Sequence, residues 1–259
     1  MKVLAITLEW SGCAVLVDDK IIFAASEERY TRIKSDSSFP SNSIKEALKI
    51  SGLKGDDFDQ VIITGKKISL IPSLINPWAV FSVEDQIKEM EEYWYPNLVL
   101  GENRSFLEVF KDKINLEQFP FNTELGKKFD IFKLKNPYTE EDAINVSEFY
   151  KEIISSFLGI QKEKIIQMEH HWCHVAYGFY GSPIRDDNTL IVTADAWGDD
   201  VSGTLSIYSK KENKINRVKE YSHKDFQLAR IYRYTTLVLK MLANRHEYKV
   251  MGLAPYYNG

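Results

Sequence analysis

The chain has few cysteines, no long apolar run and almost no excess of one charge over the other. Its two cysteines, Cys13 and Cys173, cannot build the disulfide framework of a small secreted domain. Glu9 interrupts the apolar N-terminal run too early for a secretory signal peptide, and no segment approaches the roughly 20 apolar residues of a membrane helix. These absences favour a cytoplasmic protein and argue against a membrane span.

The charge balance also limits the partners that the protein is expected to bind. The 33 basic residues stand against 37 acidic ones, which gives a net charge of -4. Proteins that bind nucleic acid generally carry an excess of basic residues, so we do not expect a nucleic acid partner. The net charge does not exclude a small basic site elsewhere on the surface. Hydrophobic residues make up 44% of the chain and charged residues 27%, the composition of a globular protein with a packed core.

Residues 1–65 carry the pattern of a small α/β unit. Three short apolar runs are joined by tight turns, which indicates antiparallel neighbours. A helix is predicted from Ser41, as its N-cap, to about Gly52, and a further strand within residues 59–65. The three runs are Lys2–Leu8, Cys13–Val17 and Ile21–Ala25.

A similar three-strand pattern recurs late in the chain. When the first strands are aligned, Thr7 matches Thr193 and Glu9 matches Asp195, so each strand ends at an acid followed by a turn. The repetition predicts an α/β protein with the actin-like ATPase (ribonuclease H-like) fold, built from duplicated three-stranded units. The alternative is that any two three-stranded meanders look alike at this level. The later runs are Thr189–Ala194, Gly203–Tyr208 and Ile215–Tyr221.

The middle segment, residues 66–145, lacks this pattern and is rich in aromatic residues. We interpret it as an insertion or lid that includes a helix over residues 84–95, and we expect most of its aromatic side chains to pack in the core. Residues 146–259 form the third segment. It is expected to contain a histidine cluster and the start of the second unit, with helices over residues 145–158 and 226–242.

Three of the five histidines lie within five positions, in the run Glu169-His170-His171-Trp172-Cys173-His174. On a helix, His170 and His174 share one face, and this spacing allows two imidazoles to bind one metal ion. Asp195, at the end of the next predicted strand, is the best candidate for a third ligand. Such a set suits iron, manganese or zinc. The alternatives are two half-buried histidines with hydrogen-bond partners, and Cys173 either as a zinc ligand or as a small core residue.

Three further polar motifs allow two interpretations each. The run Glu27-Glu28-Arg29-Tyr30-Thr31-Arg32-Ile33-Lys34 is either a solvated face or a source of phosphate contacts. Asp199 and Asp200 are more typical of an ordinary acidic turn than of metal ligands. The run from Glu247 to Pro255 indicates a helix that enters a glycine turn and stops at a proline.

Taken in order, these motifs resemble the N-terminal part of the O-carbamoyltransferases that modify nodulation factors and antibiotics. The resemblance covers nearly the whole chain and implies the actin-like fold, with the second ribonuclease H-like unit incomplete. The matching pieces are Glu27 to Lys34 with Phe39-Pro40, His170 to Ala176, Tyr180 to Pro183, Asp195 with Gly198, and Lys249 to Tyr256.

The resemblance implies an activity and a set of site residues. In such enzymes carbamoyl phosphate and ATP give carbamoyl-adenylate in a YrdC-like C-terminal domain, similar to threonylcarbamoyl-adenylate synthases. The N-terminal domain then transfers the carbamoyl group to a hydroxyl of a sugar or natural-product acceptor, at a metal expected to be Fe²⁺. His170, His174 and Asp195 match three of its four ligands. The residues expected to bind substrate or phosphate are Glu9, Arg29, Arg32, Lys34, Lys249 and Gly252.

Two departures from the family pattern keep other functions open. Trp10 and Ser11 stand where the family usually has a His-Asp or His-Asn pair. The second aspartate ligand and the C-terminal domain would lie beyond Gly259, so we expect either a fragment, with that domain in the full-length chain, or a shorter relative that obtains it in trans. The alternatives are a transferase that modifies tRNA with threonylcarbamoyl, which the acidic balance disfavours, and a degenerate actin-like module that binds without turnover.

Overall fold

The computed structural model describes residues 1–134, 139–222, 224 and 228–256. The chain divides into two compact units, Met1–Gln167 and Met168–Gly259. Both combine strands with helices, which confirms the α/β class predicted from the sequence.

A five-stranded mixed sheet forms the centre of the first unit, in the order β3-β2-β1-β4-β5. The three N-terminal strands are antiparallel, as predicted, and the tight turn between β2 and β3 has Asp18 and Asp19 in the left-handed region. Strand β4 runs parallel to β1, and helix α2 (Ser41–Ser51) lies in the connection from β3 to β4. The strands are β1 (Lys2–Thr7), β2 (Gly12–Val17), β3 (Lys20–Ser26), β4 (Gln60–Thr64) and β5 (Ile165–Met168).

Helix α2 ends at Gly52, as predicted, but the prediction of Ser41 as its N-cap is wrong. The helix begins at Ser41, and no side chain of its own cap position bonds its amides. Instead, the backbone N–H groups of Asn42 and Ser43 donate to the buried carboxylate of Glu27, at 2.9 and 2.8 Å. A residue from the preceding loop therefore satisfies the helix start, which local sequence does not reveal.

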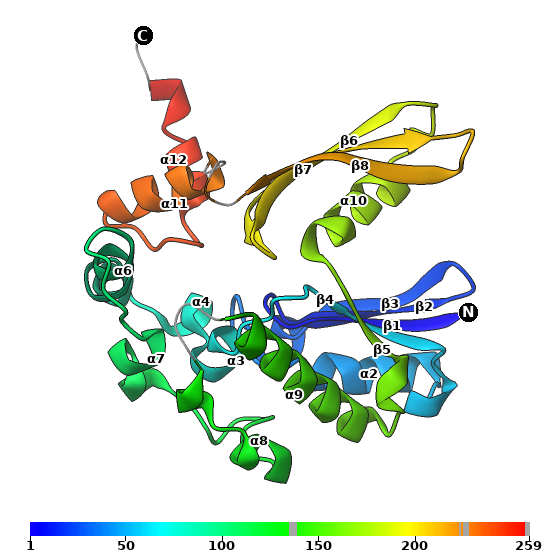
Figure 1. The fold of residues 1–259 in the computed structure, drawn as a ribbon, viewed down its shortest axis with the longest axis horizontal. Helices are drawn as coiled ribbons and strands as arrows, with labels where there is room; N and C mark the ends of the chain where they lie inside the picture. Colours follow the sequence, from blue (N-terminus) through cyan, green and yellow to red (C-terminus); the bar gives the residue numbers. More distant parts are fainter. Residues whose placement is uncertain (135–138, 223, 225–227, 257–259) are drawn as a thin grey trace. The chain divides into compact units, whose positions relative to one another are not determined.

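The long helix α9 (Glu140–Leu158) begins earlier than the predicted Asn145. Thr139 and Asp142 form a reciprocal capping box that starts the helix. In Figure 1, α9 and α2 are drawn on the same side of the five-stranded sheet. Their buried side chains belong to one core with the strands: Leu4, Ile6, Ile44, Ala47, Val61, Ile63, Val146, Ile153 and Ile154.

Residues 66–134 fold into short helical pieces that pack on the same core. Phe81, Phe106, Phe110 and Phe121 are buried with the sheet residues, so the expectation that these aromatic residues serve packing is confirmed. The predicted boundaries at residues 65 and 145 do not coincide with the division of the chain at residue 167, because the core is shared across them. The predicted helix over 84–95 is α5 followed by a π-helical segment, Glu89–Trp94.

The remaining short helices of the first unit complete its description. The α-helices are α1 (Glu28–Thr31), α3 (Ile71–Ile75), α4 (Pro77–Val80), α5 (Val83–Lys88), α6 (Tyr95–Leu98), α7 (Phe106–Val109) and α8 (Glu124–Lys128). The 3-10 helices are Gly55–Asp57, Lys111–Lys113, Ile131–Lys133 and Lys162–Lys164.

The second unit is built on a three-stranded antiparallel sheet, β6 (Thr189–Gly198), β7 (Val201–Ser209) and β8 (Lys214–Ser222), in that order. The three predicted strands are confirmed. Helix α10 (His170–Gly181) packs against this sheet (Figure 1). Its contact with the sheet is a small apolar cluster of Val175, Phe179, Ile191 and Tyr208.

Two further helices, α11 (Leu228–Val238) and α12 (Glu247–Met251), and a 3-10 helix, Ala254–Tyr256, follow the sheet. The helix predicted over 226–242 ends earlier, at Val238, before Lys240 with its positive φ of 55°. Its predicted start at Phe226 lies outside the described residues. Within the described part of the chain, no helix combines the length and the apolar character needed to cross a membrane.

Candidate metal centre

The histidine cluster lies on the first turns of helix α10, whose start is held by two carboxylates. Glu169 accepts hydrogen bonds from the backbone N–H groups of His171 and Trp172, both at 2.9 Å. Asp199 accepts from the N–H of His170 at 2.7 Å. The first three amides of the helix are thus satisfied by side chains. Asp199, expected to belong to an ordinary acidic turn, has this structural role.

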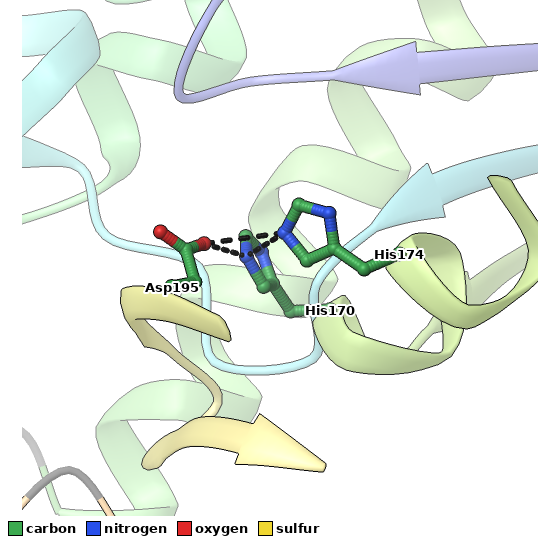
Figure 2. Close-up of side chains that lie close together, drawn as sticks. All are labelled: His170, His174 and Asp195. Atoms are coloured by element: carbon green, nitrogen blue, oxygen red, sulfur yellow. Dashed lines mark hydrogen bonds and ion pairs between the residues drawn. The ribbon is translucent and has the colours of Figure 1, made fainter. Parts of the chain in front are cut away.

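His170, His174 and Asp195 converge on one point (Figure 2). The Nε2 atoms of the two histidines are 3.0 Å apart, as the i, i+4 spacing on a helix allows. Asp195 Oδ2 lies 2.8 Å from Nε2 of His170 and 3.2 Å from Nε2 of His174. The side chains are 23%, 46% and 34% exposed, in the order His170, His174, Asp195, so the cluster is reachable from solvent.

The surroundings of Asp195 keep it ionised. Burial by itself raises the pKa of a carboxyl group. Hydrogen bonds from His170, His174 and the amide of Ala196 outweigh that effect and hold the pKa of Asp195 well below its usual range. A carboxylate in these surroundings retains its charge over the whole range of physiological pH.

The pairing of strand β6 with β7 is irregular at the position of Asp195. The pairing with β7 is irregular between Ala194 and Gly198, and Asp199 and Asp200 form the turn with φ values of 52° and 65°. Gly198 lies directly against the His170 ring, because a Cβ atom added there would be 2.1 Å from His170 Cδ2. The absence of a side chain at Gly198 therefore makes room for the His170 imidazole.

His171, which the sequence did not single out within the cluster, anchors the helix to the sheet. It is fully buried, and its Nε2 donates to the carbonyl oxygen of Val201 at 2.9 Å. Since a carbonyl only accepts, the neutral ring accepts at Nδ1 from the Thr193 hydroxyl, 2.8 Å away. Burial lowers the pKa of His171, which favours this neutral form. The sequence offered one signal for this role. His171 follows His170 by one position, so on a helix it lies on a different face from the pair His170 and His174.

The donor atoms of the three-residue cluster fit a metal ion. Around an ion with bonds of about 2.1 Å, adjacent donors are about 3.0 Å apart in an octahedron and about 3.4 Å apart in a tetrahedron. The separations of 2.8, 3.0 and 3.2 Å match one face of an octahedron. Two histidines and one carboxylate in a facial arrangement, with positions left open, are typical of Fe²⁺ sites. Cys173 is not part of the cluster, and its Sγ lies 4.0 Å from the carbonyl oxygen of Met168.

The charged run Glu27–Lys34 lies in the first unit and has a mixed character. Arg29 and Arg32 are exposed and have no ion pair among the residues that the structure describes. Lys34 is exposed and lies 3.4 Å from Glu28. Glu27 is instead structural, because its buried carboxylate holds the start of α2. The exposed part of the run fits a solvated face, Glu27 has a structural role that neither interpretation included, and phosphate contacts by Arg29, Arg32 and Lys34 stay a prediction.

Glu27→Gln is expected to destabilise the first unit by about 1–3 kcal/mol, because a buried acceptor of several N–H groups loses its charge and one of its acceptor oxygens. The matched control is Glu28→Gln, since Glu28 is partly exposed and contacts the exposed Lys34 at 3.4 Å and the single N–H of Ser35 at 2.9 Å. Urea unfolding followed by circular dichroism measures both variants. Equal stability of the two would show that the Glu27 contacts contribute nothing.

The other candidate residues are distributed over both units. Glu9 is half-buried in the turn after β1, and the adjacent Trp10 stacks on Trp78 with ring centroids 4.6 Å apart. Ser11 is buried and donates to the carbonyl of Ser38. Lys249 is exposed on α12, and its Nζ lies 5.9 Å from the centroid of the Tyr248 ring.

Gly252 follows α12 at its C-terminal end and is exposed. In the described residues, no hydrogen bond or ion pair connects Lys249 or Gly252 with the histidine cluster. Their assignment to substrate or phosphate stays a prediction.

Fold and cluster together define an α/β protein with a candidate two-histidine, one-carboxylate metal site. The family model described as "Carbamoyltransferase N-terminus" matches residues 2–258, and the chain belongs to this family.

Two curated relatives match nearly the whole chain. An uncharacterized protein of Synechocystis sp. is 25% identical over 250 residues, which cover 95% of this chain and 33% of that protein. The Nodulation protein NolNO of Sinorhizobium fredii is 26% identical over 251 residues, 96% of this chain and 28% of that protein. The chain therefore spans about a third or less of the length of these relatives.

Proposed function

We propose that this chain carries the transfer step of a carbamoyltransferase, in which a carbamoyl group passes from carbamoyl-adenylate to a hydroxyl of a sugar or natural-product acceptor. The observation that carries the proposal is the convergence of two Nε2 atoms and one carboxylate oxygen within 3.2 Å of one another, in a chain of the carbamoyltransferase N-terminus family. His170, His174 and Asp195 would hold a divalent metal, with Fe²⁺ as the first candidate.

The transfer is a substitution at the carbamoyl carbon. The acceptor oxygen bonds to that carbon, the bond to the adenylate oxygen breaks, AMP leaves with the electron pair, and the hydroxyl proton passes to solvent. A divalent metal would supply a Lewis acid for negative charge on carbamoyl or phosphate oxygens. His170 and His174 would bind it as neutral ligands and Asp195 as an anion, so the site would keep positive charge for an anionic substrate.

The arrangement of strands supports the actin-like fold for this function. In each unit three antiparallel strands follow one another in the chain. An acid lies near the end of the first strand of each: Glu9 follows β1, and Asp195 lies within β6, which continues to Gly198. In the first sheet β1 is flanked by antiparallel β2 and parallel β4. We infer two related units, as an actin-like ATPase fold requires.

The substrates follow from the same proposal. ATP and carbamoyl phosphate would be converted to carbamoyl-adenylate by a YrdC-like domain, in the same full-length protein or in trans. Arg29 and Arg32, exposed cations with no described ion pair, are the first candidates for phosphate contacts, followed by Lys34 and Lys249.

Metal-dependent carbamoyl transfer tests the proposed function. Full-length protein is supplied with ATP, carbamoyl phosphate labelled in its carbamoyl carbon, and a panel of sugar and aminocyclitol acceptors. We expect label on an acceptor hydroxyl together with release of AMP, loss of both after chelation, and recovery with Fe²⁺. Transfer that is equally fast in chelated protein would contradict the metal role. Tight tRNA binding at physiological salt without transfer to these acceptors would favour the threonylcarbamoyl alternative.

A further inference from the structure

The two sides of the candidate metal cluster come from different elements of the second unit. Helix α10 supplies His170 and His174, and strand β6 supplies Asp195. The first residue of a helix frays most easily, and His170 is that residue in α10. The geometry of the cluster therefore depends on contacts that fix the start of α10 relative to the sheet.

Arg217, on strand β8, makes such a contact without touching the cluster itself. Its Nη2 donates to Glu169 Oε2 at 2.6 Å, and the two side chains are only 16% and 13% exposed. Glu169 in turn accepts from the amides of His171 and Trp172. One carboxylate thus joins strand β8 to the turn of α10 that carries His170.

The guanidinium of Arg217 is fixed from a second side by Trp172. Its central carbon lies 4.7 Å from the centroid of the Trp172 ring. Arg217 Nε is buried and has no hydrogen-bond partner, so one N–H donor of this side chain is unsatisfied. Its further ion pair, at 3.3 Å, is with Glu220, whose side chain is 61% exposed, and a pair with a solvated partner contributes little. The bond to Glu169 is therefore the main polar contact of this arginine.

We propose that Arg217 and Glu169 are positioning residues for the metal site, because their bond fixes the start of helix α10 and thereby the separation of the histidine nitrogens from Asp195. The inference rests on the proposed function, since it takes the cluster to be a metal site. Contacts of this kind, one step removed from the ligands, typically change metal affinity by about 10–100-fold.

Titration of metal-free, full-length protein with Co²⁺ tests this inference, because the visible spectrum of Co²⁺ reports the geometry of its ligands. Arg217→Met keeps an unbranched side chain of similar length beside Trp172, and it removes the guanidinium together with its bond to Glu169. We expect it to lower Co²⁺ affinity by about 10–100-fold and to alter the spectrum. Arg217→Lys, which restores the charge, should recover part of both. Lys219→Met removes an exposed cation from the same strand and should change neither.

The thermal midpoint of each metal-free variant separates positioning from general stability. Unchanged Co²⁺ affinity and spectrum in Arg217→Met would overturn the inference, whatever the thermal midpoint. If that variant does not fold, Arg217→Lys and Glu169→Gln decide the matter, and wild-type affinity and spectrum in both would overturn it. Absence of Co²⁺ binding by the wild type would instead refute the metal site of the proposed function.

Discussion

Under the proposed function, the double variant His170→Ala/His174→Ala is expected to bind no divalent metal and to transfer no carbamoyl group. Removing both imidazoles leaves Asp195 as the only member of the cluster, and a single carboxylate ligand is not sufficient to hold a divalent ion tightly. Since a Lewis acid supplies several kcal/mol of transition-state stabilisation, transfer should fall by on the order of 10³-fold or more. Metal content per chain is measured by elemental analysis of protein purified without oxygen.

A change on the same helix that leaves the cluster intact serves as the control. Tyr177 is 82% exposed on α10, so Tyr177→Ala should keep both metal content and transfer. Metal content equal to the wild type in the double variant would show that the ion is bound elsewhere.

Gly198→Ala is expected to disrupt the metal site although it changes no ligand. The added Cβ would lie 2.1 Å from His170 Cδ2 and 2.6 Å from its Nε2, far inside contact distance. The imidazole has to leave its place opposite Asp195, so we expect a loss of metal affinity of about 100-fold or more. Titration of metal-free protein with Fe²⁺ or Co²⁺ measures this loss.

The matched control for this variant is Gly178→Ala. A Cβ at Gly178 meets only the Ile191 side chain, at an ordinary 3.7 Å, and alanine favours a helix by about 1 kcal/mol over glycine. Gly178→Ala should therefore bind metal like the wild type. The steric account fails if Gly198→Ala binds metal equally well.

Much of the local structure could be predicted from the sequence. The antiparallel strands of both sheets follow from short apolar runs and tight turns, which are local features. The pairing of His170 with His174 follows from helical spacing alone. Asp195 was chosen because it ends the next predicted strand, which is a weaker argument, and the structure places its carboxylate within 3.2 Å of both imidazoles.

The features that the sequence did not predict depend on contacts between distant segments. Glu27 caps a helix that begins 14 positions later, so Ser41 was wrongly taken as the N-cap. Arg217 bonds Glu169 across 48 positions. Gly198 is explained only by the His170 ring beside it. Propensity and periodicity describe neighbours in the chain and give no information on such pairs.

Anomalous X-ray diffraction at the iron edge, from crystals grown with Fe²⁺ in the absence of oxygen, tests the metal site most directly. The account predicts one strong peak at about 2.1 Å from the Nε2 atoms of His170 and His174 and from a carboxylate oxygen of Asp195. No peak between these three side chains, or an iron bound to other residues, would contradict it.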